Sequence, residues 1–144
     1  MTRRAVRDTR LTEKYDRMIA DLQRFQRESR PDASGLPREV RDILDYIHAH
    51  LFEPGLNVNA VKVQCGIRNN NISTRFRHAV GLGIREYIEA LRLDAADSLL
   101  RREELEIYLV AMAVGYDHQE TFYRAFQRRF ARTPSRGRNG IGLD

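Results

Sequence analysis

Two segments of this chain, about fifty residues apart, repeat one pattern of apolar residues around a glycine. The first copy is Val58-x-x-Val61-x-x-x-x-Gly66-Ile67 with Ile72-x-x-x-Phe76, and the second is Ile107-x-x-Val110-x-x-x-x-Gly115-Tyr116 with Phe122-x-x-x-Phe126. Each copy predicts a short helix, a sharp turn at the glycine and a second helix, because glycine adopts a positive φ at a helix end without steric cost. The chain is therefore constrained to pack two pairs of helices in the same way, as two helix-turn-helix units.

A long amphipathic helix is predicted between the two copies, from about residue 84 to residue 100. Its apolar face is formed by residues at helical spacing, namely Ile84, Ile88, Leu91, Ala95 and Leu99. At about 1.5 Å per residue such a helix is roughly 25 Å long. A rod of this length can set the two units about 34 Å apart, which is one turn of a DNA duplex. The arrangement therefore predicts two recognition helices in successive major grooves.

Two further helices are predicted ahead of the repeat. Residues 1–30 read as a polar lead-in and one helix, with an apolar stripe of Leu11, Tyr15, Met18, Leu22 and Phe25. Two heptads are too few for a coiled coil, so we interpret this helix as packed on the main domain, with a dimer contact as the alternative. After a turn-rich linker at 30–35, a second helix begins near Pro37 with a core stripe of Val40, Ile43, Leu44, Ile47 and Leu51. His48 and His50 are expected at its surface or boundary, on different faces.

Composition narrows the class of protein. Apolar residues make up 42% of the 144 residues, which excludes a disordered chain. No apolar run approaches the roughly 20 residues of a membrane span, and no apolar stretch follows Met1 as in a secretory signal. The single cysteine, Cys65, excludes an internal disulfide and a multi-cysteine metal site. We therefore expect a cytoplasmic protein without membrane contact, metal or cofactor.

The charge is basic and unevenly distributed. The net charge is +5 and the isoelectric point about 9.8. No acidic residue stands between Glu53 and Glu86, where the basic residues are Lys62, Arg68, Arg75, Arg77 and Arg85. None stands between Glu120 and Asp144, where they are Arg124, Arg128, Arg129, Arg132, Arg136 and Arg138. Two basic stretches, each containing the second helix of one copy, indicate two surfaces that face a polyanion, with chance clustering of solvated charge as the alternative.

Two long stretches resemble the AraC-type DNA-binding domain. Tyr87-Ile-Glu-Ala-Leu-Arg-Leu-Asp-Ala-Ala-Asp-Ser-Leu-Leu100 resembles the linker-helix pattern of that family. Residues 107–134, from Ile107-x-x-Val-Ala111-x-x-x-Gly115-Tyr116 through Phe122-x-Arg124-x-Phe126 to Thr133-Pro134, resemble the family signature over its second motif. The similarity spans about residues 40–138. It implies a two-lobed helical domain that binds duplex DNA and regulates transcription, most often as an activator that also contacts RNA polymerase.

The resulting organisation is all-α, with two helix-turn-helix subdomains joined by a long linker helix and preceded by an N-terminal helix. We expect an N-terminal extension at 1–36, an AraC-type domain at 37–138 and a tail at 139–144. Within the domain, the first helix-turn-helix spans about 57–80, the linker helix about 84–100 and the second helix-turn-helix about 106–130. Only some 36 residues precede the domain, so the chain resembles the compact stand-alone members, which lack a ligand-sensing domain.

The resemblance also implies which residues contact DNA. The expected base-contacting residues are Asn70, Ser73 and Thr74 from the first unit and Gln119, Glu120, Tyr123 and Arg124 from the second. Asparagine and glutamine suit adenine, arginine suits guanine, and glutamate accepts a hydrogen bond from cytosine. The expected phosphate contacts are Arg68, Asn69, Asn71, Arg75, Arg77, Arg128 and Arg129, which would add affinity without sequence preference.

Several of these residues have a structural alternative. Asp117-His-Gln-Glu120 matches a capping box, in which Glu120 would bond back to the helix start. Asn69-Asn70-Asn71 can be a polar helix start, with Asn69 as a plausible cap, and Thr74, Arg128 and Arg129 can be solvated surface. The phenylalanines beside the basic residues are expected in the core: Phe76, Phe122, Phe126 and Phe130.

Some positions depart from the family pattern. Lys62 stands in place of a usual alanine, Arg68 in place of a capping serine, Ala131 in place of a glycine and Gly137 in place of a tyrosine. The first unit therefore fits less well than the second, and its helix contacts either bases or mostly phosphate. Tyr108 and Leu109 lie off the apolar stripe of their helix, where polar residues are usual. They are either exposed for a protein partner or folded back onto the chain.

The leading hypothesis is a sequence-specific regulator of transcription that binds double-stranded DNA as a monomer or as a weak dimer through the N-terminal helix. A protein-binding module that keeps this fold is the main alternative, with the N-terminal helix or Tyr108 and Leu109 as its contact. An enzyme is not expected. Related domains occur in methyl-acceptor repair proteins, but Cys65 falls on an apolar helix stripe, and no general base or metal-ligand set accompanies it.

Overall fold

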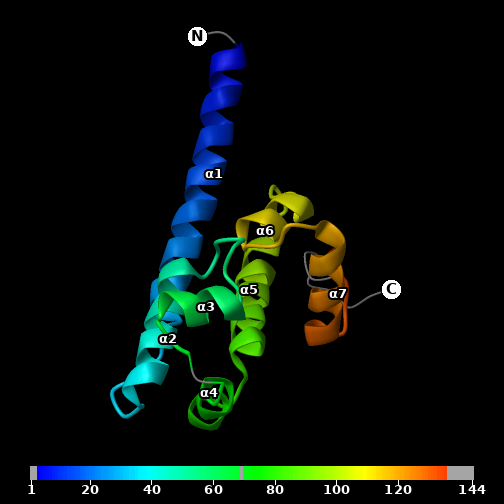
Figure 1. The fold of residues 1–144 in the computed structure, drawn as a ribbon. Helices are drawn as coiled ribbons and strands as arrows, with labels where there is room; N and C mark the ends of the chain where they lie inside the picture. The colour runs from blue at the N-terminus through cyan, green and yellow to red at the C-terminus, as the bar shows by residue number, and fades with distance from the viewer. Residues whose placement is uncertain (1–2, 69, 136–144) are drawn as a thin grey trace.

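The computed structural model describes residues 3–68 and 70–135, with side chains from residue 12 onward, and this part forms seven helices and no strand (Figure 1). The helices are α1 (Arg3–Glu28), α2 (Arg38–His50), α3 (Val58–Gln64), α4 (Ile72–Val80), α5 (Ile84–Leu100), α6 (Ile107–Ala113) and α7 (Gln119–Phe130). The predicted fold class is confirmed: α3–α4 and α6–α7 are the two helix-turn-helix units, α5 joins them and α1 precedes them. Within the described ranges no helix is both long enough and apolar enough to cross a membrane.

The two repeat glycines form turns with the same hydrogen-bond pattern. Gly66 has φ 67° and Gly115 has φ 108°, as predicted from their place in the pattern. The amide of the residue after each glycine donates back into the preceding helix, from Ile67 N to Lys62 O at 2.9 Å and from Tyr116 N to Ala111 O at 3.0 Å. Together with the glycine's own bond to the preceding turn, this is a Schellman motif, which satisfies the last carbonyls of the helix. The repeat in sequence is therefore a repeat in backbone geometry.

Two apolar clusters make up the core, one for each lobe. The first lobe holds α2, α3 and α4 around residues such as Ile43, Ile47 and Phe76, all 0% exposed. The second lobe holds α6 and α7 around Phe122 and Phe126, also 0% exposed. Helix α5 belongs to both clusters, since its first half contributes Ile84, Tyr87 and Ile88 to the first and its second half contributes Leu93, Ala96 and Leu100 to the second. The linker helix is thus a wall shared by both lobes.

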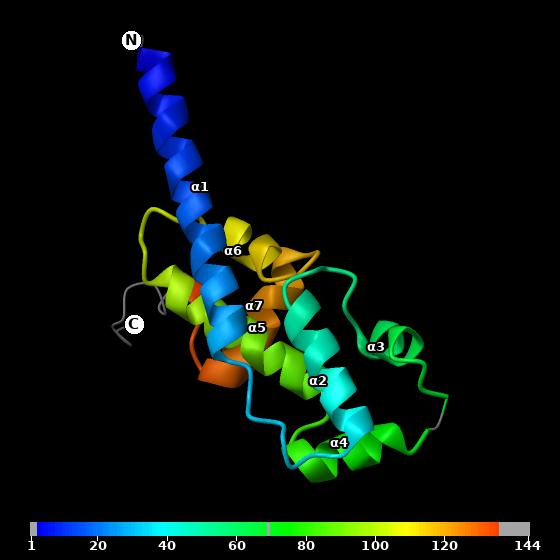
Figure 2. The ribbon, with the colours of Figure 1, turned by 90° about the vertical axis from the view of Figure 1, so that its left-hand side faces the viewer.

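Helix α1 packs on the main domain, as the sequence favoured. Met18 and Leu22 are buried in the cluster of the second lobe, and Phe25 contacts both clusters. The helix lies against α2 and α5, while its N-terminal half projects beyond the rest of the molecule (Figures 1 and 2). The alternative role of α1 as a dimer contact stays a hypothesis, as do the predicted boundaries at residues 36 and 138.

His48 corrects one prediction, because it is buried and not at the surface or boundary. Its Nε2 lies 2.6 Å from the Tyr87 hydroxyl and its Nδ1 3.3 Å from the Gln26 carbonyl oxygen. Helix α2 is covered by both α1 and α5, so its buried face is wider than the apolar stripe alone indicates. Burial lowers the pKa of His48, with the Gln26 bond acting in the opposite direction. His50, by contrast, is half-exposed and pairs with Glu53.

One departure from the family pattern has a visible backbone consequence. Ala131 ends α7 in the left-handed conformation with φ 57°, the conformation that favours the glycine usual at this position. Lys62 is half-buried on α3, and Gly137 lies outside the described residues.

Candidate nucleic-acid interface

The second helix of each unit is anchored by one buried face. Ile72 and Phe76 on α4, and Phe122 and Phe126 on α7, are all fully buried. Each pair is four residues apart and therefore lies on one face of its helix. The opposite faces of α4 and α7 point away from the core. The prediction of core phenylalanines is confirmed for Phe76, Phe122 and Phe126, whereas Phe130 is only partly buried against the second cluster.

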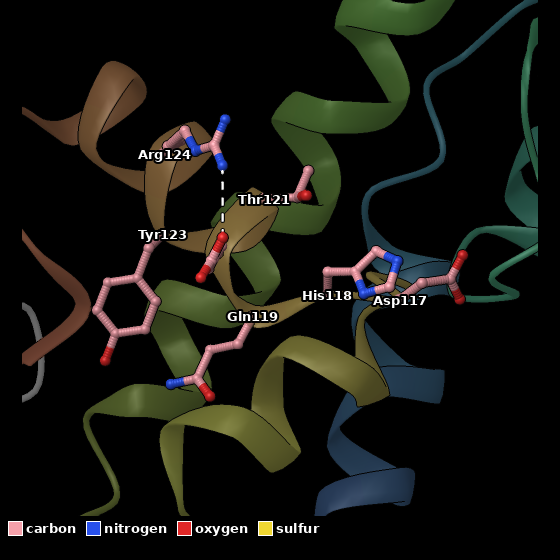
Figure 3. A pocket seen from close by; sticks show the side chains of 7 residues that line it. Asp117, His118, Gln119, Thr121, Tyr123 and Arg124 are labelled. Carbon is pink, nitrogen blue, oxygen red and sulfur yellow. Dashed lines mark ion pairs between the residues drawn. The ribbon is translucent and has the colours of Figure 1, made fainter.

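The outward face at the start of α7 gathers all four base-contacting residues predicted for this helix. Gln119, Glu120 and Arg124 are exposed, and Tyr123 is half-buried. They line a shallow surface hollow at the N-terminus of the helix (Figure 3), whose walls are Asp117, His118, Gln119, Glu120, Thr121, Tyr123 and Arg124. Thr121 shares this hollow and was missing from the sequence prediction, although its place between Glu120 and Phe122 on the recognition helix could have indicated it.

The capping-box interpretation of Asp117 and Glu120 is wrong. The N-cap of α7 is His118, with no side-chain cap bond, so Glu120 is the second helical residue and not the third. Glu120 instead lies 3.6 Å from Arg124, one turn further along (Figure 3). Its side chain is 88% exposed and that of Arg124 is 72% exposed, so this pair is weak and both groups are accessible to a ligand.

The start of α4 differs from the prediction. The helix begins at Ile72 with Asn71 at the N-cap, so Asn70 stands in the preceding turn and not on the recognition helix. The cap position belongs to Asn71 and not to Asn69, which lies outside the described residues. Thr74 is exposed and Ser73 is half-buried on the helix itself. An amphipathic pattern does not fix the residue at which a helix begins after the turn at Gly66.

Four of the arginines predicted to contact phosphate are paired with carboxylates. Arg75 pairs with Glu39 of α2. The other three pair with α5: Arg77 with Glu86 at 3.1 Å, Arg128 with Glu89 at 3.1 Å and Arg129 with Asp94 at 2.8 Å. The basic stretches are free of acids only along the sequence, because α2 and α5 supply acids from 9 to 39 residues away. Among the described residues Arg68 and Arg85 are exposed and have no ion pair.

A cleft of about 490 Å³ lies between the two lobes. Its walls come from the start of α3, from α5 and from α7, and include Asn57, Arg85, Arg92, Tyr116 and Arg128. Burial raises the pKa of Tyr116 to about 12, so its hydroxyl stays protonated and can donate a hydrogen bond. The cleft therefore presents cations and neutral donors, together with the carboxylate of Glu89 that pairs with Arg128. Arg92 belongs to the resembling linker pattern, but the sequence assigned it no role.

Tyr108 and Leu109, at the start of α6, were expected either to be exposed or to fold back onto the chain. Tyr108 is exposed. Its side chain is 48% exposed, Met112 one turn later is 37% exposed, and Leu109 is half-buried. Ile19 of α1 is also 49% exposed. Apolar side chains thus remain uncovered on α6 and on α1.

The only cysteine has the environment of an unreactive thiol. Cys65 is half-buried at the end of α3, with its Sγ 3.8 Å from the Asp42 carbonyl oxygen. Burial raises the pKa of Cys65, with the negative charge of Asp42 acting in the same direction. The thiolate, which is the nucleophilic form, is therefore disfavoured.

Relatives in sequence agree with this geometry. The family model described as a helix-turn-helix domain matches residues 63–140. The regulatory protein SoxS of Escherichia coli strain K12 is 35% identical over 96 residues, which are 67% of this chain and 89% of SoxS. The right origin-binding protein of the same strain is 33% identical over 96 residues, or 67% of this chain and 33% of that protein.

Solved structures agree as well. The C-terminal domain of AraT, a response regulator from Geobacillus stearothermophilus, matches with a TM-score of 0.70 and 26% identity over 77% of this chain and 92% of that one. A probable AraC family transcriptional regulator from Rhodopseudomonas palustris shares the fold, with a TM-score of 0.60 and 22% identity over 72% of this chain and 97% of that one. The chain therefore belongs to the AraC-type helix-turn-helix family of transcription regulators.

Proposed function

We propose that this protein binds specific sites on double-stranded DNA by inserting α4 and α7 into two successive major grooves. The observation that carries the proposal is that two helix-turn-helix units with the same turn geometry are packed on one continuous helix, α5, each with its recognition helix facing away from the core. One chain then recognises a bipartite site that other helix-turn-helix proteins recognise as dimers.

The two recognition helices have different chemistry. Helix α7 offers Gln119, Tyr123 and Arg124 around its N-terminus, which is the end that enters the groove in helix-turn-helix proteins. Glutamine and arginine make paired hydrogen bonds to adenine and guanine. Helix α4 offers Ser73 and Thr74, which accept and donate less selectively, with Asn70 in the turn before it. We therefore expect α7 to carry more sequence selectivity than α4.

Arg124→Ala is expected to weaken binding to the target by about 1–3 kcal/mol and to relax the preference at one base pair. The reason is that an exposed arginine near the start of α7 bonds guanine with two donors, which alanine cannot replace. Binding to a panel of duplexes with each base pair changed in turn measures this effect. Arg68→Ala is the control, because Arg68 is exposed without an ion pair among the described residues, and loss of a phosphate contact weakens binding to every duplex alike. An equal loss of affinity for every duplex in Arg124→Ala would mean that Arg124 also contacts a DNA phosphate and not a base.

Glu89→Gln is expected to strengthen binding to any duplex several-fold, because it releases Arg128 from a carboxylate 3.1 Å away. The free guanidinium then neutralises a phosphate and steepens the salt dependence by about one charge. Titration of a labelled duplex at several salt concentrations measures both effects. Glu103→Gln makes the same change in net charge at an exposed glutamate for which the described structure shows no ion pair, so it should leave binding nearly unchanged. Equal gains in both variants would mean that only the net charge matters.

The exposed apolar residues on α1 and α6 favour a protein contact in addition to DNA. Ile19, Tyr108 and Met112 offer such a surface, and two occupants are consistent with the function: RNA polymerase, for an activator, or a second copy joined weakly through α1. In this proposal the protein activates transcription at the bacterial nucleoid in the cytoplasm and catalyses no reaction. Analytical ultracentrifugation of the protein, with and without the target duplex, distinguishes the two partners. A dimer through α1 is detected in the absence of RNA polymerase, whereas a monomer favours the polymerase contact.

A further inference from the structure

Arg92 is a buried cation at the seam between the two lobes. It lies in the middle of α5 and is 8% exposed, although arginine is seldom so buried without partners. Its Nε donates to the carbonyl oxygen of Leu51 at 2.9 Å, and its Nη2 donates to that of Glu53 at 2.7 Å. Both carbonyls follow directly after the end of α2, where a cation also complements the helix dipole. One side of the guanidinium is therefore fixed to the first lobe.

The same guanidinium also lies against the turn of the second lobe. A Cβ added at Gly115 would lie 2.7 Å from Arg92 Cζ, so the turn between α6 and α7 rests directly against the planar group. Gly115 has φ 108°, a conformation that glycine adopts freely. Tyr116 and Asp117, which follow in this turn, interact electrostatically with Arg92. The glycine is thus required here both for its backbone conformation and for the close approach of Arg92.

Apolar side chains also span the seam, beside polar contacts between α1 and α2 such as the hydrogen bond that Gln26 donates to the His48 carbonyl oxygen. Phe25 and Phe52 contact both clusters and lie 6.1 Å apart between ring centroids. Apolar contacts are non-directional, so they add stability without the orientation dependence of a hydrogen bond. Hydrogen bonds with a planar guanidinium are directional. Arg92 adds directional hydrogen bonds in the middle of this seam, on the helix α5 that is packed into both lobes.

We propose that Arg92 is a positioning residue that fixes α4 and α7 at one separation and angle, and so sets the spacing between the two DNA half-sites that the protein accepts. This inference rests on the proposed binding of two grooves by one chain. Arg92 touches no DNA in this account and acts through the carbonyls of Leu51 and Glu53 and the turn at Gly115. Its loss should therefore change which spacings are tolerated more than how each half-site is recognised.

The test uses the full chain and duplexes carrying the two half-sites enriched from a randomised pool. These half-sites are presented at the selected spacing and with one base pair added or removed. The wild type should prefer the selected spacing strongly, whereas Arg92→Met should reduce this preference about tenfold, because loosely linked modules lose the advantage of a fixed geometry. Affinity for a duplex with the α7 half-site alone should change little.

The ratio of the affinities for duplexes of different spacing distinguishes a positioning role from a loss of stability. A partly unfolded variant binds all duplexes less well by the same factor, which leaves this ratio unchanged. Ile43→Val, in the core of the first lobe, is the control that lowers stability without touching the seam. Arg92→Lys keeps the charge but not the planar pair of donors, so it should lose part of the preference for the selected spacing. This variant also provides the test if Arg92→Met does not fold. A preference that both Arg92 variants share with the wild type would overturn this role. A wild type without any spacing preference would contradict the two-groove function itself, and this inference with it.

Discussion

Replacing Leu22 with alanine should lower the free energy of unfolding by about 2–5 kcal/mol. Leu22 is 7% exposed and lies in the apolar cluster of the second lobe, although it belongs to α1, far from that lobe in sequence. The loss combines the lost transfer energy of the side chain with the cavity left behind. Because a domain of this size is stabilised by only about 5–15 kcal/mol, this change should be visible as a large shift in a urea unfolding curve followed by circular dichroism.

The matched control stands on the same helix. Ile19 has a similar apolar volume but is 49% exposed, so Ile19→Ala should change stability by about 0.5 kcal/mol or less. Equal effects of the two substitutions, or no effect of Leu22→Ala, would mean that α1 does not pack on the second lobe in solution. A large effect of Ile19→Ala alone would indicate a stabilising contact on the outer face of α1, such as a second copy.

Raising the salt concentration from 50 to 200 mM should weaken binding to duplex DNA by up to about 500-fold. Five arginines are expected to contact phosphates, and each phosphate neutralised contributes about −0.9 to the slope of log affinity against log salt. The five are Arg68, Arg75, Arg77, Arg128 and Arg129. Four of them must exchange a carboxylate for a phosphate, so five phosphate contacts are an upper limit. Fluorescence anisotropy of one labelled duplex at a series of salt concentrations gives the slope.

Two substitutions calibrate this slope. Arg68 is exposed, precedes the first recognition helix in sequence and has no ion pair among the described residues, so Arg68→Ala should reduce the slope by about one. Arg27 is an exposed arginine on α1, away from both recognition helices, and Arg27→Ala should leave the slope unchanged. A slope near zero, or an equal change in both variants, would contradict the placement of these phosphate contacts.

Much of the fold follows from the sequence because its signals are local. The apolar residues of α5 repeat with helical spacing from Ile84 to Leu99, and the structure bounds this helix at Ile84 and Leu100. Gly66 and Gly115 mark turns because a positive φ is costly for other residues, and both adopt it. The family resemblance then supplied the relative placement of the two units, which periodicity alone does not determine.

Contacts between residues distant in sequence were the part that could not be predicted. The basic stretch after Glu120 contains no acid, yet Arg128 and Arg129 meet Glu89 and Asp94 across the fold. His48 looked like a surface residue because no pattern on α2 shows that Tyr87 of α5 covers it. Glu120 fitted a capping box by spacing, but α7 starts one residue too late for that bond. The first two errors concern polar side chains whose partners depend on packing across the fold. The third concerns the residue at which a helix starts, which periodicity does not fix.

The central claim is that one chain places two recognition helices in successive major grooves. Selection of bound duplexes from a randomised pool at about 150 mM salt, where non-specific phosphate binding is weakened, tests it most directly. The expected result is two enriched motifs whose centres are about 10–10.5 base pairs apart. A single enriched motif, or no enrichment, would contradict the insertion of both α4 and α7.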